Sequence, residues 1–172
     1  KVIIILLLCM PIAANAADYY VATNGNDNNP GTLSQPWATW QKGFKSISAG
    51  DILFIRGGTY SPTATQGSGS GGTIYAGVYI TGKDGTSGSK YKVFNYPGEI
   101  PILDGTNITN AGRRAGILLN SCNYWHIKGL KIQNFAQYSS GAYSSQGVQI
   151  NSGNNNLIEN CIAYANGGPG FR

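Results

Sequence analysis

Two stretches decide the fold of this chain: residues 116–123 read GILLNSCN, and residues 147–154 read GVQINSGN. The match continues to Ile127 and Ile158 at the same offset of 31 residues. A repeat of this length is typical of a solenoid. Each unit is too poor in apolar residues to fold alone, so it buries its apolar face by stacking on its neighbours.

The periodicity within the repeat indicates stacked strands and not stacked helices. Apolar residues alternate with a period of two, and the connecting segments are rich in Asn, Gly and Ser, which are not helix formers. The expected stacked pairs are Ile117 with Val148, Leu119 with Ile150, and Ile127 with Ile158.

Asparagines recur in the same alignment, at Asn120 and Asn151 and again at Asn123 and Asn154. We expect them at the corners between strands, because Asn tolerates a left-handed backbone and hydrogen-bonds locally. Ladders of Asn side chains are expected to follow from this placement.

The register of the later strands has two solutions. With the same offset, Leu130 and Ile132 meet Cys161 and Ala163, whereas a slip of one residue brings Ile162 inward instead. The sequence leaves this choice open.

Cys122 and Cys161 are the two cysteines that lie beyond residues 1–16, and the repeat places them apart. Cys122 aligns with Gly153 and Cys161 aligns with Leu130, so the two occupy different positions around the coil. A disulfide needs Cα atoms within about 7 Å. We therefore expect two free thiols that fill space as small apolar groups.

Residues 1–16 have the features of a secretory signal peptide. Lys1 precedes an apolar run, and Ala14-Asn-Ala16 is a cleavage site of the A-x-A type. The apolar run is far shorter than the roughly 20 residues that span a bilayer. We expect no membrane span, a mature chain from about Ala17, and a protein that is secreted, periplasmic or displayed on the cell surface.

Residues 17–50 are expected to hold a strand, a turn and a capping helix. Residues 18–23 read as the strand, and the turn formers NGNDNNPG follow at 24–31. Apolar residues then recur at three- and four-residue spacing, as in an amphipathic helix that covers the open end of the stack. These residues are Trp37, Trp40, Phe44 and Ile47.

Residues 51–172 are expected to form the first rungs of the solenoid. After Tyr60 the chain alternates turn-rich loops with one strand, at residues 78–80. Residues 67–72, GSGSGG, satisfy the dinucleotide motif G-x-G-x-x-G, but no helical pattern follows them, so we interpret them as a flexible loop. A further strand is resuming at residues 167–172, so we expect the chain to be a fragment.

Composition favours a turn-rich β protein with a modest positive charge. Glycine accounts for 25 of 172 residues, charged residues for 11%, and the formal net charge is +5. Such a field favours an acidic partner such as a uronate polymer, and ordinary solubility is the alternative explanation of the charge. Nucleic acid is not expected, because Arg113 and Arg114 form no basic stripe and no recognition helix accompanies them.

Lys128 and Lys131 are the candidate substrate-binding residues, because they lie near the repeated strands and carry positive charge. A solvated outer face is the alternative, since long basic side chains are usually exposed. His126 is the only histidine and is expected to decorate a strand or corner. The carboxylates are scattered along the chain, so no metal ligand, cofactor or catalytic residue is assigned within it.

Three blocks occur in order along the chain: YYVATNGNDNNPGT at residues 19–32, QPWATWQK at 35–42, and AGDILFIRGGTY at 49–60. Residues 95–105 and 124–132 follow them. Together these segments resemble the N-terminal part of the secreted right-handed parallel β-helix proteins of polysaccharide lyase family 9, the pectate lyases.

The resemblance implies an all-β, right-handed parallel β-helix with a short N-terminal capping helix, of which this chain holds only the first rungs. In that family, aspartates that bind calcium and a lysine that removes a proton lie in later rungs, so none is carried over to this chain. We expect the N-terminal part of a monomeric, calcium-dependent, pectate lyase-like enzyme that cleaves an acidic polysaccharide such as pectate by β-elimination. The part itself is expected to be inactive. The alternative is a non-catalytic β-helix for glycan binding or surface attachment.

Overall fold

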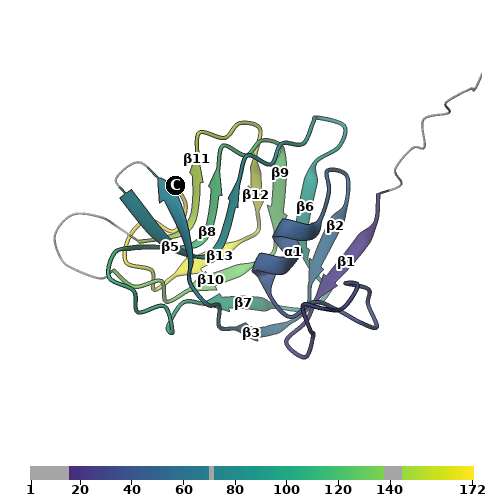
Figure 1. The fold of residues 1–172 in the computed structure, drawn as a ribbon, viewed down its shortest axis with the longest axis horizontal. Coiled ribbons are helices and arrows are strands. Elements are labelled where there is room, and N and C mark those ends of the chain that lie inside the picture. The colour runs from purple at the N-terminus through teal and green to yellow at the C-terminus, as the bar shows by residue number, and fades with distance from the viewer. Residues whose placement is uncertain (1–15, 70–71, 138–144) are drawn as a thin grey trace, which may run out of the picture.

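Three sheets wrapped around a common apolar interior form the body of the molecule (Figure 1). The computed structural model describes residues 16–69, 72–137 and 145–172. Sheet A contains β1 (Asp18–Val21), β2 (Ile52–Ile55), β6 (Tyr91–Asn95), β9 (Trp125–Lys128) and β12 (Leu157–Glu159). Sheet B contains β3 (Gly58–Tyr60), β7 (Pro101–Asp104), β10 (Lys131–Gln133) and β13 (Ile162–Tyr164). Sheet C contains β4 (Thr65–Gly69), β5 (Gly72–Thr81), β8 (Arg113–Asn120) and β11 (Gln146–Asn151).

The chain visits the sheets in the order A, B, C and then returns to A. It completes this circuit three times from β2 onward, and β12 and β13 begin a fourth. All strand pairs are parallel except β4 with β5. This path is the expected parallel β-helix.

The predicted register between rungs is confirmed. The directly paired residues include Ile117 with Val148, Leu119 with Ile150, and Ile127 with Ile158. The later strands keep the same offset, because Ile132 pairs with Ala163 and points into the core, whereas Ile162 is 58% exposed. The alternative one-residue slip is therefore wrong.

The corners repeat their backbone conformation from one rung to the next. Residues with a left-handed backbone recur at the 31-residue offset. Seven of them are not glycine and have φ between 51° and 63°, and the eighth is Gly129 with φ of 71°. The pairs are Ser121 with Ser152, Tyr124 with Asn155, Gly129 with Asn160, and Asn134 with Ala165.

The asparagines at the corner between sheets C and A were expected to be left-handed, and this is wrong by one residue. The left-handed residues directly follow Asn120, Asn123, Asn151 and Asn154. The Asn side chains instead join neighbouring rungs. The amide N–H of Asn154 donates to Asn123 Oδ1 (2.7 Å), and that of Asn123 donates to Asp84 Oδ1 (2.9 Å). Of the two expected ladders, the one at Asn123 and Asn154 is therefore seen as backbone-to-side-chain hydrogen bonds, with Asp84 as its first member.

The Gly/Ser segment that was expected to be a loop is largely a hairpin. Residues 65–69 form β4, which pairs antiparallel with the first half of β5. A Cβ atom on Gly67 would lie 2.7 Å from the Tyr79 ring and 2.9 Å from a Leu118 methyl group. Close packing therefore requires glycine at this position. A glycine-rich strand of this kind has the same composition as a flexible linker.

One helix, α1 (Trp40–Ser46), contacts β1, β2 and β5 and covers the end of the coil (Figure 1). The expected cap residues Trp37, Trp40, Phe44 and Ile47 are all at most 5% exposed. The helix is shorter than predicted, because Thr39 is its extended N-cap and accepts the N–H of Lys42. Trp37 lies before the helix and bridges to Val21, and Ile47 is the extended C-cap.

The interior holds an aromatic stack that reaches from the cap into the third rung. The ring of Phe44 lies parallel to that of Trp125, with centroids 5.8 Å apart, and Tyr91 stacks on the same indole at 4.5 Å. Cys122 is buried nearby, and both Cys122 and Cys161 are free, as predicted. Burial raises the pKa of each thiol, which leaves them unreactive as fillers of the stack.

The expected signal peptide, apart from Ala16, lies outside the described residues. Of the described residues, none belongs to a helix that is long and apolar enough to cross a membrane.

Candidate functional site

Lys128, the first candidate, lies on the outer face of sheet A and is paired. Its ammonium is 2.8 Å from Glu159 Oε1, and Nε2 of His126 is 2.9 Å from Glu159 Oε2. The contact with Lys128, and then that with His126, lowers the pKa of Glu159. Glu159 therefore already balances the charge of Lys128, and an incoming polyanion would have to compete with it.

Lys131, the second candidate, lies on the outer face of sheet B. Its ammonium sits 4.8 Å from the centroid of the Tyr164 ring, and the Tyr164 hydroxyl donates to Gln133. A left-handed corner at Gly129 separates β9 from β10. The two lysines consequently lie on adjoining faces of the coil and not on one face.

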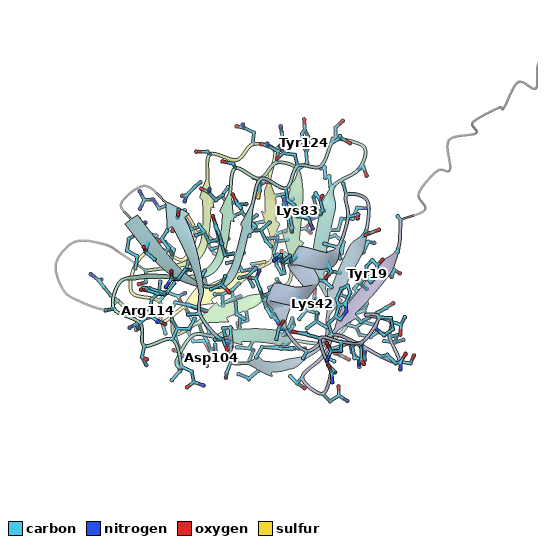
Figure 2. The ribbon with its side chains drawn as sticks, viewed as in Figure 1. Tyr19, Lys42, Lys83, Asp104, Arg114 and Tyr124 are labelled. Carbon is cyan, nitrogen blue, oxygen red and sulfur yellow. The ribbon has the colours of Figure 1, made fainter. Side chains whose placement is uncertain are left out.

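Asp104 (Figure 2), the last residue of β7, has a heavily hydrogen-bonded carboxylate. It accepts the side-chain amides of Gln133 (2.6 Å) and Asn134 (3.0 Å) and the hydroxyl of Thr106 (2.5 Å). Burial raises its pKa, but these hydrogen bonds outweigh burial and hold the pKa below its usual value. With its oxygens committed in this way, Asp104 is a structural acceptor.

The described residues do not fit a calcium site. They contain no group of three or more His, Cys, Asp or Glu side chains that could hold a metal ion, whereas calcium takes six to eight oxygen ligands. Asp27, in the turn after β1, accepts the amide groups of Ala38 (2.8 Å) and Thr39 (2.9 Å). That turn serves to fix the start of α1.

Two side chains that sequence reasoning missed fasten the cap to the coil. Gln41 of α1 lies against β5 as a further strand would: its amide N–H donates to Tyr79 O (3.1 Å), and its carbonyl accepts Tyr79 N–H (2.8 Å). The ammonium of Lys83, which lies beside α1 (Figure 2), donates to the carbonyls of Lys45 (2.8 Å) and Ile47 (2.5 Å). It thereby satisfies carbonyl groups that a helix leaves open at its C-terminal end.

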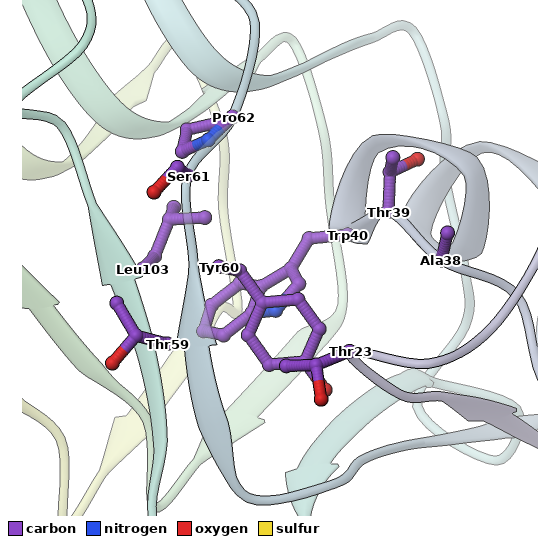
Figure 3. Close-up of a pocket in the computed structure, with 9 residues that line it drawn as sticks. All are labelled: Thr23, Ala38, Thr39, Trp40, Thr59, Tyr60, Ser61, Pro62 and Leu103. Carbon is purple, nitrogen blue, oxygen red and sulfur yellow. The ribbon is translucent and has the colours of Figure 1, made fainter.

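Three cavities lie in a row beside this cap. The first, of about 180 Å³, lies between the start of α1 and the end of β3, and Thr23, Thr59, Tyr60 and Trp40 are among its lining residues (Figure 3). The second, of about 250 Å³, is lined by Ser61 and its neighbours together with Gln41. The third, of about 430 Å³, extends to Lys45 and Lys83. No motif in the sequence marks these residues, because they come from five separate segments.

Comparison with known proteins places this geometry in a family. The model of the family described as "Pel9A-like, right handed beta helix region" matches residues 19–172. The chain is 31% identical to Pectate lyase PEL9 of Emericella nidulans, over 93% of this chain and 36% of that protein. It is 33% identical to Pectate lyase L of Paenibacillus polymyxa, over 91% of this chain and 30% of that protein.

A solved structure titled "Rhamnogalacturonan lyase" superposes with a TM-score of 0.74 at 26% identity, covering 82% of this chain and 34% of that one. The chain spans about a third of the length of each of these three relatives. The strand path, the cap and the match along the whole described coil agree, and the chain belongs to the Pel9A-like right-handed β-helix family.

Proposed function

We propose that this chain is the N-terminal cap and the first rungs of a secreted polysaccharide lyase that cleaves an acidic polysaccharide by β-elimination. The observation that carries the proposal is the family match over residues 19–172, together with relatives named as pectate lyases at 31% and 33% identity. Pectate is the first candidate substrate. Rhamnogalacturonan is the second, because of the structural likeness to a rhamnogalacturonan lyase.

The proposed chemistry needs groups beyond those described. β-Elimination requires a base that removes the proton next to the sugar carboxylate, and stabilisation of the negative charge that develops. Lys128 is ion-paired with Glu159, and the carboxylate of Asp104 already accepts hydrogen bonds, so neither side chain meets these needs. In this proposal the chain therefore fixes the register and closes the end of the coil on which the chemistry is built, and calcium dependence belongs to the whole protein.

Lys128 and Lys131 are proposed to supply a weak attraction for the polyanion. The side chain of Lys128 is 41% exposed, and both lysines point outward from neighbouring strands. Their contribution is expected to be small and to fall with added salt, because exposed charges are screened over about 8 Å at physiological ionic strength.

A lyase assay on the full-length protein tests the proposed function. The protein is incubated with polygalacturonate or with rhamnogalacturonan, with calcium or with a chelator, while the ultraviolet absorbance of unsaturated products is followed. We expect an increase on one of the two substrates that the chelator abolishes. Binding without any increase on either substrate would contradict the lyase and favour the non-catalytic β-helix.

Secretion is tested separately. If residues 1–16 are a signal peptide, N-terminal sequencing of the protein recovered from the culture medium should begin at Ala17. Recovery of the intact N-terminus from the cytoplasm would contradict this proposal.

A further inference from the structure

The three cavities beside the cap are parts of one groove. The first and second share the lining residues Thr39, Ser61 and Pro62. The second and third share Gln41 and Thr65. The groove thus runs along one side of α1, between the helix and the chain that leads from β3 to β4. Its separate parts add up to the size range of sites for small organic ligands, which is roughly 300–1,000 Å³.

The lining chemistry is that of a sugar site. Hydroxyl groups of Thr and Ser recur along its whole length, and no lining residue is an Asp or Glu. Aromatic rings of Trp40 and Tyr60 form the wall of the first cavity (Figure 3). Trp40 and Tyr60 are only 2% and 7% exposed, so the hydroxyls carry most of the match. A pyranose offers hydroxyls to the Thr and Ser side chains and a C–H edge to the small aromatic surface that remains.

The polar groups at this end of the groove are one buried N–H and several exposed hydroxyls. The indole N–H of Trp40, which is only 2% exposed, makes no hydrogen bond within the described part of the chain. Thr23, Thr59 and Ser61 beside it are exposed, so their hydroxyls face solvent and are open to a ligand. A buried N–H normally finds a partner, so the Trp40 indole is an unsatisfied donor at this end of the groove.

The two ends of the groove differ in charge. Charged lining residues occur only at the third cavity, where the Lys83 ammonium is held by the carbonyls at the end of α1. Lys45 is exposed there and forms no ion pair with any described residue. The free cation at this end fits a carboxylate, and the uncharged end fits neutral sugar hydroxyls.

We propose that this groove is an accessory binding site for an oligosaccharide segment, with neutral sugar units in the hydroxyl-lined cavity beside Thr59 and Ser61 and a uronate carboxylate near Lys45. The choice of a uronate-containing chain rests on the proposed function, whereas the sugar chemistry of the groove rests on its lining. Such a site holds the polysaccharide at the capped end of the coil, away from the rungs on which cleavage is proposed.

Isothermal titration calorimetry on the full-length protein, in a chelator that silences calcium-dependent cleavage, tests this proposal. The probes are an oligogalacturonide and a neutral galacto-oligosaccharide. Ser61→Tyr places a ring in the middle of the groove, at an exposed residue that lines two of the cavities. Ser87→Tyr is the matched control, because Ser87 is also exposed and lines none of them.

We expect Ser61→Tyr to raise the Kd for both probes by about tenfold or more and Ser87→Tyr to leave it unchanged. Lys45→Gln should weaken only the oligogalacturonide, by about threefold, and high salt should remove this difference. Equal binding by the wild type and Ser61→Tyr would overturn the proposal, as would equal losses in both tyrosine variants. If Ser61→Tyr does not fold, Thr63→Tyr blocks the second cavity instead.

The outcome is separable from that of the proposed function. A protein that cleaves polygalacturonate but binds equally well with Ser61→Tyr refutes the groove and keeps the lyase. A protein that binds through the groove and cleaves neither substrate refutes the lyase and keeps a glycan-binding cap.

Discussion

The two ends of the coil carry similar apolar strands but differ in how well these are buried. At the end covered by α1, core residues such as Leu53 and Ile55 are fully buried. At the other end, large apolar side chains are between 42% and 58% exposed; they are Leu157, Ile162, Tyr164 and Phe171. Ile127 and Ile158 occupy the same place in the repeat, yet only Ile127 is fully buried.

Burial in this fold therefore belongs to the stack and not to the individual rung. A rung becomes a core layer when something lies above and below it. At the first end the cover is α1, which the side chains of Gln41 and Lys83 fasten to the coil. At the second end Gly170 and Arg172 begin a further strand on β11, with Ile150 N–H donating to Arg172 O at 2.8 Å.

Truncating an aromatic residue at each end should give the largest contrast. Trp40→Ala is expected to reduce the free energy of unfolding by about 3–5 kcal/mol, because the indole is 2% exposed and leaves a cavity. In a protein that ends at Arg172, Phe171→Ala removes a side chain that is 45% exposed and should cost about 1 kcal/mol or less. Urea denaturation followed by circular dichroism measures both. Equal losses would show that the two ends are equally ordered.

Removing the side-chain amide of Gln41 should have an intermediate effect on the free energy of unfolding. Gln41→Leu keeps the bulk but leaves the N–H and C=O of Tyr79 without partners, which should cost about 1–3 kcal/mol. Hydrogen exchange at the Tyr79 amide should accelerate. Gln35→Leu, at an exposed glutamine in the turn before the helix, is the control and should change neither quantity.

The ammonium of Lys83 should contribute somewhat less to stability, and its contribution should depend on pH. Lys83→Met is expected to cost up to about 2 kcal/mol near neutral pH, because the carbonyls at the end of α1 lose their cation. Burial lowers the pKa of Lys83 below 10.5. The unfolded chain then binds more protons than the folded one between the two pKa values, so the wild type should gain stability as the pH rises through that window.

Denaturation at several alkaline pH values, compared between the wild type and Lys83→Met, measures this linkage. The variant should lack the gain. A wild type that loses stability over the same window would show that the carbonyl contacts outweigh burial and raise the pKa instead.

The smallest effect is expected at the exposed end, on the outer face of sheet A. Lys128→Gln should raise the pKa of Glu159 back toward 4.5, because the ammonium is the main cause of its depression. A carboxyl with a depressed pKa stabilises the fold above its unfolded pKa, and this contribution is lost as the pH falls through the folded pKa. Carbon NMR titration of Glu159 measures the shift, with Lys131→Gln as the control that should leave it unchanged.

The stacking of the rungs could be predicted from the sequence, whereas the side chains that fasten the cap to them could not. The pairing of Ile117 with Val148 was predictable, because alternating apolar residues and a constant offset leave a single register. The β4–β5 hairpin was missed because glycine serves both a flexible linker and a close approach such as that of Gly67. Gln41 and Lys83 were missed because each contacts backbone nearly forty residues away, where composition carries no signal.

The candidate site shows the same limit. Lys128 and Lys131 were identified by their charge, but whether they share a face depends on the corner at Gly129 and on a partner, Glu159, one rung further along. The groove was invisible in the sequence, since threonines and serines from separate segments become a site only once the helix lies across the first rung.

The stacking of Phe44 on Trp125 sets a condition on how the protein folds. The two rings are separated by about eighty residues of chain, so this contact carries the loop-closure entropy of a long-range pairing and slows folding relative to local contacts. During synthesis from the N-terminus, α1 can form early, but its inner ring has no partner until the strand bearing Trp125 has left the ribosome. Completion of the cap is therefore timed by the third rung, and a ribosome stalled before that point would carry a chain with an exposed, adhesive aromatic surface.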